Sequence, residues 1–323
     1  MAQFRGALPQ LQGELFLTDG GIETTLVFHE GIALPDFAAF VLLNYPDGQE
    51  ALRKYFLSYC AIARQYGTGL ILESPTWRAN PDWANHLGFT PQGLADANRQ
   101  AIALLQALRS EVGGEAGSAN IPIVISGCIG PRGDGYIPDD VMDPFQAQQY
   151  HSEQIGIFAE TAADMITALT MNYADEAVGI ALAARDAHMP VVIAFTVETD
   201  GRLPTGQGLL EAIEAVDSAT ASYPAYYMIN CAHPDHFEAV LTPSNRRVQR
   251  IRGLRANASR KSHAELNDAV ALDSGDPAEL GAQYARLRQR LPQINVMGGC
   301  CGTDQRHIEQ IAKACKPLFH AAL

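Results

Sequence analysis

The chain has 323 residues, of which 47% are hydrophobic, enough for one large α/β domain or two ordinary ones. Its formal net charge of −13, with no basic cluster, argues against a nucleic-acid partner, which needs a basic surface. The chain shows no signal-peptide pattern, no apolar run of ~18 residues and only six cysteines, so we expect a cytoplasmic protein with reduced thiols, no membrane partner and no disulfide scaffold.

Along the chain, apolar runs typical of buried strands alternate with helical patterns. We predict strands over residues 15–18, 70–73, 121–126, 165–170, 191–197, 226–230, 250–255 and 294–297. The helical patterns span residues 49–66, 94–112, 145–163, 174–187, 208–222, 233–241, 278–291 and 303–318. This strict alternation predicts a single (β/α)8 TIM barrel, one domain over residues 1–323. A doubly wound open sheet is the main competitor, but no glycine-rich phosphate loop follows any strand, so nucleotide binding has little support.

Polar and aromatic side chains follow several predicted strands, at the end where a parallel barrel gathers its working residues. The first strand leads into Asp19-Gly20-Gly21, where the glycines let a ligand approach the backbone, although this is also ordinary turn chemistry. The other candidate ligand-binding residues are Glu73, Trp77 and Trp83 after the second strand, Tyr136 beyond the third, Glu198 after the fifth and Asn230 at the end of the sixth.

Three cysteines stand at two of these strand ends: Cys231 after the sixth strand, and Cys300 with Cys301 after the eighth. Adjacent residues of a regular strand point to opposite faces, so the flanking glycines must let the strand end or kink for both to serve one site. Three thiolates suit Zn²⁺ and leave one position open for a substrate. His233 is a conceivable fourth ligand, but it fits better as the start of the next helix.

The remaining cysteines do not join this pattern. Cys60 and Cys315 fall on apolar helical stripes and are expected in the core, while Cys128 at the third strand is expected to pack as a small residue.

The chain resembles the zinc-dependent homocysteine S-methyltransferases, which include betaine–homocysteine and S-methylmethionine–homocysteine methyltransferases. The resemblance spans nearly the whole chain. It rests on Asp19-Gly20-Gly21, Gly127-Cys128-Ile129-Gly130-Pro131, Ala194-Phe195-Thr196, Asn230-Cys231 and Gly298-Gly299-Cys300-Cys301-Gly302. It implies a (β/α)8 barrel that makes methionine, with Cys231, Cys300 and Cys301 as zinc ligands. It also implies that Asp19, Gly20 and Gly21 help to hold the amino-acid part of the acceptor.

One position departs from the family. Members that use homocysteine carry a glutamate at the end of strand four for the substrate's ammonium group, and Leu169 occupies that position here. Losing a buried counter-charge costs an ammonium several kcal/mol. Either Glu198 or Glu73 replaces it, or the acceptor is another thiol. Glu198 could instead pair with Arg202, and Asn230 could orient Cys231 or merely satisfy the strand end.

The chemistry expected is methyl transfer to a zinc-bound thiolate, because coordination to zinc deprotonates a thiol that is otherwise largely protonated at neutral pH. The chain has no room for folate and cobalamin modules, so we expect a small onium donor, either a sulfonium or a quaternary ammonium. Trp77, Trp83 and Tyr136 could supply aromatic faces for it, with Glu73 as counter-charge.

Two alternatives keep the metal and change the function. A zinc hydrolase would activate water at the open position, but three thiolates raise the pKa of bound water. A non-catalytic zinc- or thiol-binding barrel would bind metal without turnover. In either case we expect small-molecule ligands, and a homo-oligomer is possible.

Overall fold

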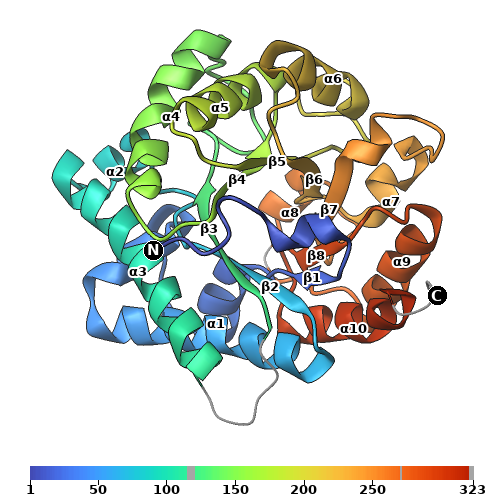
Figure 1. Cartoon of the computed structure of the whole chain (residues 1–323), viewed down its shortest axis with the longest axis horizontal. Helices are drawn as coiled ribbons and strands as arrows, with labels where there is room; N and C mark the ends of the chain where they lie inside the picture. The colour runs from blue at the N-terminus through green and yellow to red at the C-terminus, as the bar shows by residue number, and fades with distance from the viewer. Residues whose placement is uncertain (115–120, 270, 320–323) are drawn as a thin grey trace.

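The computed structural model describes residues 1–114, 121–269 and 271–319, and in it eight parallel strands close into one barrel in sequence order (Figure 1). This confirms the predicted TIM barrel and rules out the open sheet. The strands are β1 (Phe16–Leu17), β2 (Gly69–Glu73), β3 (Ile123–Ile129), β4 (Met165–Met171), β5 (Val191–Phe195), β6 (Tyr226–Asn230), β7 (Ile251–Ala256) and β8 (Val296–Gly299).

Helices surround the strands (Figure 1). They are α1 (Pro46–Tyr66), α2 (Pro81–His86), α3 (Pro91–Gly114), α4 (Pro144–Ala159), α5 (Ala174–Asp186), α6 (Leu209–Thr220), α7 (Pro234–Phe237), α8 (His263–Asn267), α9 (Pro277–Arg290) and α10 (Gln305–Cys315). The short α2 and α8 were not expected, and neither was the π-helix Thr24–His29 after β1. The helix expected over residues 233–241 is α7 followed by the 3-10 turn Glu238–Val240.

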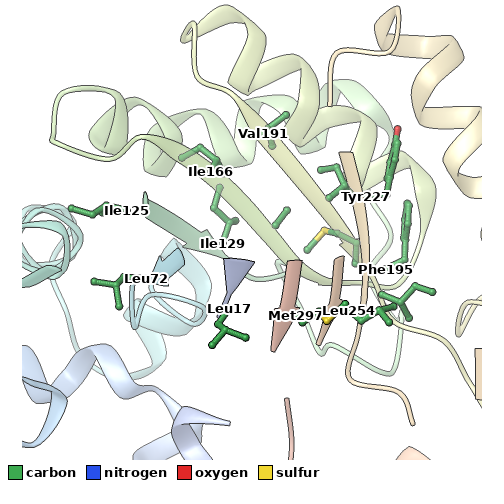
Figure 2. Packing of buried hydrophobic residues seen from close by; sticks show 14 of the residues in the cluster. Leu17, Leu72, Ile125, Ile129, Ile166, Val191, Phe195, Tyr227, Leu254 and Met297 are labelled. Atoms are coloured by element: carbon green, nitrogen blue, oxygen red, sulfur yellow. The ribbon is translucent and has the colours of Figure 1, made fainter. Parts of the chain in front are cut away.

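Two apolar layers follow from the alternation of side chains along each strand. Outward-facing residues such as Leu72, Ile166 and Leu254 pack beneath the helices in the larger cluster (Figure 2). Inward-facing residues such as Ile71, Val124 and Leu169 fill the barrel interior in a second cluster. The interior is therefore a packed core.

The amino-terminal segment is anchored at the end of the barrel where the strands begin. Asp164, which precedes β4, accepts hydrogen bonds from the backbone N–H groups of Gln3 (2.6 Å) and Phe4 (2.9 Å). Its other oxygen pairs with the Arg109 guanidinium at 2.7 Å. Asn295 donates to the carbonyl of Gln10 at 2.7 Å. With this end closed, the opposite rim is left for chemistry.

Within the part of the chain that the structure describes, no helix combines the length and the apolar character that crossing a membrane requires.

Candidate active site

A cavity of about 320 Å³ opens where the barrel strands end. It gathers most of the residues that the sequence singled out, from strands far apart in the chain. These are Asp19, Gly20, Gly21, Glu73, Trp77, Tyr136, Asn230, Cys231, Cys300 and Cys301. Glu198 and Trp83 are not among its lining residues.

The three predicted ligand cysteines converge in this cavity. The three Sγ atoms, those of Cys231, Cys300 and Cys301, all lie within 4.8 Å of one another. Cys231 and Cys300 form a disulfide with Cα atoms 5.3 Å apart, and Cys301 is a free thiol. A tetrahedral ion with Zn–S bonds of about 2.3 Å needs sulfur atoms roughly 3.8 Å apart, which this spacing allows once the disulfide is reduced. The donor set therefore fits a soft metal.

Glycines explain how neighbouring cysteines can share one site. A Cβ on Gly298 would collide with Thr18, and one on Gly299 would collide with Thr303, so the end of β8 runs too close to its neighbours for side chains. Gly302 then turns the chain at φ +78°, a conformation that favours glycine. The strand thus ends at the cysteine pair, as the sequence required.

Asn230 fixes the position of Cys231. It is fully buried, its Oδ1 accepts from the Thr170 N–H at 2.9 Å, and its Nδ2 donates to Thr170 Oγ1 at 2.9 Å and to Cys231 Sγ at 3.3 Å. Both Thr170 (φ 64°) and Cys231 (φ 53°) adopt the left-handed conformation that non-glycine residues avoid. One amide therefore stabilises two strained residues at the edge of the cysteine cluster.

His263 supports the same cysteine from the other side. One of its ring nitrogens contacts the Cys231 carbonyl oxygen, and Nδ1 lies 3.0 Å from Glu198 Oε1. Its ring lies 4.1 Å from that of Tyr136, whose hydroxyl is 3.8 Å from Cys301 Sγ. Glu198 thus orients a histidine at the rim of the site. Among the described residues its side chain forms no ion pair with Arg202, whose guanidinium donates to the Gly206 carbonyl instead.

Asp19 is already engaged by the protein. Its Oδ1 pairs with Arg255 Nη1 at 2.7 Å, and its Oδ2 accepts from the Tyr55 hydroxyl at 2.9 Å. Arg255 is 5% exposed, and the nearby carboxylates raise its pKa despite burial, so it stays charged. A Cβ on Gly21 would lie 2.6 Å from the Cys300 carbonyl oxygen, which ties the β1 turn to the cysteine loop.

Glu73 contributes a buried carboxylate to the cavity floor. It is 4% exposed, and among the described residues neither of its oxygens has a hydrogen-bond partner. Burial raises its pKa, while Arg255 and the nearby hydroxyls of Ser126 and Thr167 oppose that shift. Leu169, at the end of β4, also lines the cavity and carries no charge.

The two tryptophans behave differently from each other. The indole N–H of Trp77 donates to the Leu169 carbonyl at 3.3 Å, and Trp77 lines the cavity. Trp83 does not line the cavity. The Arg78 guanidinium lies 3.7 Å from the ring centre of Trp83 and 4.3 Å from that of Trp77. A protein cation therefore already occupies one aromatic face of each tryptophan.

Glu23, Arg255 and His263 are site residues to which sequence reasoning gave no role. Glu23 lines the cavity and interacts electrostatically with Cys301 and Tyr136, and desolvation raises its pKa from 4.5 to about 7. Arg255 could have been found from the inward register of β7, and Glu23 from the segment after Asp19-Gly20-Gly21. Nothing in the sequence links His263 to Cys231. By contrast, His233 accepts from the Asp235 N–H at the start of α7, as expected of a cap.

Comparisons with known proteins agree with this architecture. The sequence matches the family described as homocysteine S-methyltransferase over residues 16–315. Its structure is similar to the homocysteine methyltransferase MmuM from Escherichia coli. The metallated form gives a TM-score of 0.72 at 18% identity and the oxidized form 0.73 at 19%, each over 95% of this chain and 98% of that one. At these identities the structural likeness shows the fold alone. Among curated protein sequences, none matches this chain significantly.

Proposed function

Because this chain belongs to the homocysteine S-methyltransferase family and is therefore a thiol S-methyltransferase, we propose that it transfers a methyl group from a small onium donor to homocysteine, giving methionine. We further propose Zn²⁺ as its metal, held by Cys231, Cys300 and Cys301. The observation that carries this proposal is the convergence of three cysteine sulfurs within 4.8 Å in the cavity of the barrel.

Zinc would lower the pKa of the acceptor thiol, so that its sulfur is a nucleophilic thiolate at neutral pH. The protein's own work is positioning. Asn230 and His263 hold Cys231, and Asn257 Oδ1 accepts from the Cys301 N–H at 3.1 Å. A cytoplasmic location, where thiols are kept reduced, suits a site that needs all three sulfurs.

The turn after β1 is our proposed contact for the amino-acid part of the acceptor. Gly20 and Gly21 present backbone to the cavity, and Asp19 orders this turn through Arg255. Asn230 would act on the acceptor indirectly, because its Nδ2 donates to the sulfur atoms of Cys231 and Cys300. The geometry of Glu198 favours an indirect role, in which it orients His263.

The donor is proposed to bind above the cysteines, against aromatic faces and a carboxylate. Trp77, Tyr136, Phe28 and Phe37 line the cavity, and Glu23 stands near Tyr136. Aromatic faces attract onium cations by roughly 0.5–2 kcal/mol each. Trp83 has less support, because it lies outside the lining and faces Arg78.

The test uses reduced protein reconstituted with zinc. Incubation with homocysteine and, in turn, S-methylmethionine, S-adenosylmethionine, betaine and dimethylsulfoniopropionate should give methionine with at least one donor. Methylation of another mercapto acid but not of homocysteine would favour a different acceptor, an alternative that the apolar Leu169 keeps open.

Variants separate the metal from the turnover. Cys231→Ala should lose both zinc and methyl transfer, whereas Cys315→Ala, in a fully buried helical position away from the cavity, should keep both. Zinc binding without methyl transfer from any donor would point to a non-catalytic barrel.

A further inference from the structure

We propose that Glu73 receives the ammonium group of the acceptor amino acid and so sets the enzyme's preference for an amino-acid thiol. This inference rests on the methyl transfer proposed above. It names the side chain that discriminates between thiols in the same cavity.

Glu73 points into the barrel by its register on β2. Side chains alternate along a strand, and Ile71, two residues earlier, belongs to the inner cluster. Glu73 therefore emerges at the top of the packed interior. It lines the cavity with 4% of its surface exposed.

Among the described residues, Glu73 is the deeply buried cavity carboxylate whose oxygens lack a hydrogen-bond partner. Asp19 is paired with Arg255 and Tyr55. Glu198 is paired with His263 and lies outside the lining. Glu73 is therefore available to a cationic ligand group in a way that the other two are not.

The charges at the cavity floor call for one more cation. The cavity lining contains four carboxylates, those of Asp19, Glu23, Glu73 and Asp273, and two guanidinium groups, those of Arg78 and Arg255, so acidic groups outnumber basic ones by two. Asp19 pairs with Arg255, and Glu73 is the deeply buried carboxylate whose oxygens have no hydrogen-bond partner among the described residues. Burying a carboxylate without a partner is costly, and here burial raises its pKa. A ligand ammonium would remove this cost and keep Glu73 ionised.

Homocysteine has the shape for this pairing. Two methylene groups and the α-carbon separate its sulfur from its ammonium nitrogen, so one end can face the cysteines while the other meets a different strand end. Leu169 offers no charge at the end of β4, but it can pack against those methylenes. In the proposed complex the cysteines face the sulfur of homocysteine, and Glu73 faces its ammonium group.

The experiment compares homocysteine with 4-mercaptobutanoate, which is homocysteine without its amino group. In Glu73→Gln, which keeps the side chain's size, kcat/KM for homocysteine should fall about 30-fold or more, while kcat/KM for 4-mercaptobutanoate stays within a few-fold of wild type. Glu160→Gln, an exposed residue that pairs with Arg99 on the surface, is the control and should change neither.

Two results would overturn the proposal. One is an equal fall for both acceptors together with a raised donor KM, which would assign Glu73 to the donor. The other is an unchanged ratio between the acceptors in a folded Glu73→Gln protein.

A binding measurement on the wild type does not depend on the variant folding. Calorimetry with reduced, zinc-loaded protein should show homocysteine binding about 30-fold or more tightly than 4-mercaptobutanoate, and equal affinities would refute the role of Glu73. If this preference holds but no donor yields methionine, the proposed reaction fails while the ammonium site stands.

Discussion

Asn230→Ala tests whether the cysteine centre depends on the amide that holds it. The variant removes the acceptor of the Thr170 N–H, a bond of 2.9 Å, and the donor contacts of Nδ2 to Thr170 Oγ1, Cys231 Sγ and Cys300 Sγ. A buried N–H without a partner costs about 1–3 kcal/mol. The strained backbone conformations of Thr170 and Cys231 also lose the hydrogen bonds that stabilise them. We expect the free energy of unfolding to fall by about 2–4 kcal/mol.

The same change should weaken zinc binding. Residues that orient metal ligands typically contribute about 10–100-fold to affinity, and Asn230 Nδ2 reaches Cys231 Sγ at 3.3 Å. The assay is competition for zinc between reduced protein and a chromogenic chelator, alongside urea unfolding of the same samples.

Asn98→Ala is a matched control, because Asn98 is also fully buried but lies outside the cavity lining. Its Nδ2 donates to the carbonyls of Ala79 (3.2 Å) and Leu94 (3.1 Å). It should lose comparable stability and keep its zinc affinity. The reasoning is refuted if Asn230→Ala binds zinc within about 2-fold of wild type, or if the control weakens zinc equally.

Three further predictions follow from the buried groups. Burial raises the pKa of Glu23 from 4.5 to about 7, so its neutral form stabilises the fold below pH 4.5 and this contribution is lost as pH rises through 7; Glu23→Gln should flatten the unfolding free energy measured across that range. Metal analysis should find zinc on reduced protein and little on protein that keeps the Cys231–Cys300 disulfide; equal loading would contradict the three-sulfur site. Asp164→Ala leaves the buried Arg109 unpaired and should cost about 3–5 kcal/mol in urea unfolding, whereas a loss below about 1 kcal/mol would show that the pair is dispensable.

The fold was predictable because parallel barrel strands are buried on both faces and therefore appear as continuous apolar runs. The bounds of β3 were less predictable: the prediction ended the strand at residue 126, but it continues to Ile129. Gly127 was taken as a strand end. A Cβ there would lie 2.6 Å from the Phe158 ring, so the glycine lets α4 pack closely against a strand that continues.

The cysteines of the site could be predicted because thiolate ligation is specific to residue type, so three such residues at strand ends carry their own chemistry. Arg255 and Glu23 are harder to assign, because the β7 register and the segment after β1 place them near the cavity but do not show which polar groups they meet there. The tryptophans show the same limit: Trp77 lines the cavity and donates to the Leu169 carbonyl, whereas Trp83 does neither, and the order of residues does not reveal this difference.

The Asp19–Arg255 pair connects the two proposals about the site. Three thiolates on one divalent ion carry a net charge of −1, and two further carboxylates beside them would repel an anionic thiol strongly. Arg255, paired with Asp19 at 2.7 Å, offsets one of them and leaves Glu73 as the uncompensated charge. A zwitterion brings an ammonium to that charge, whereas a mercapto acid without an amino group adds another negative charge and no cation. The same electrostatics thus support both the proposed onium donor and the proposed amino-acid acceptor, because each brings a positive charge to an acidic cavity.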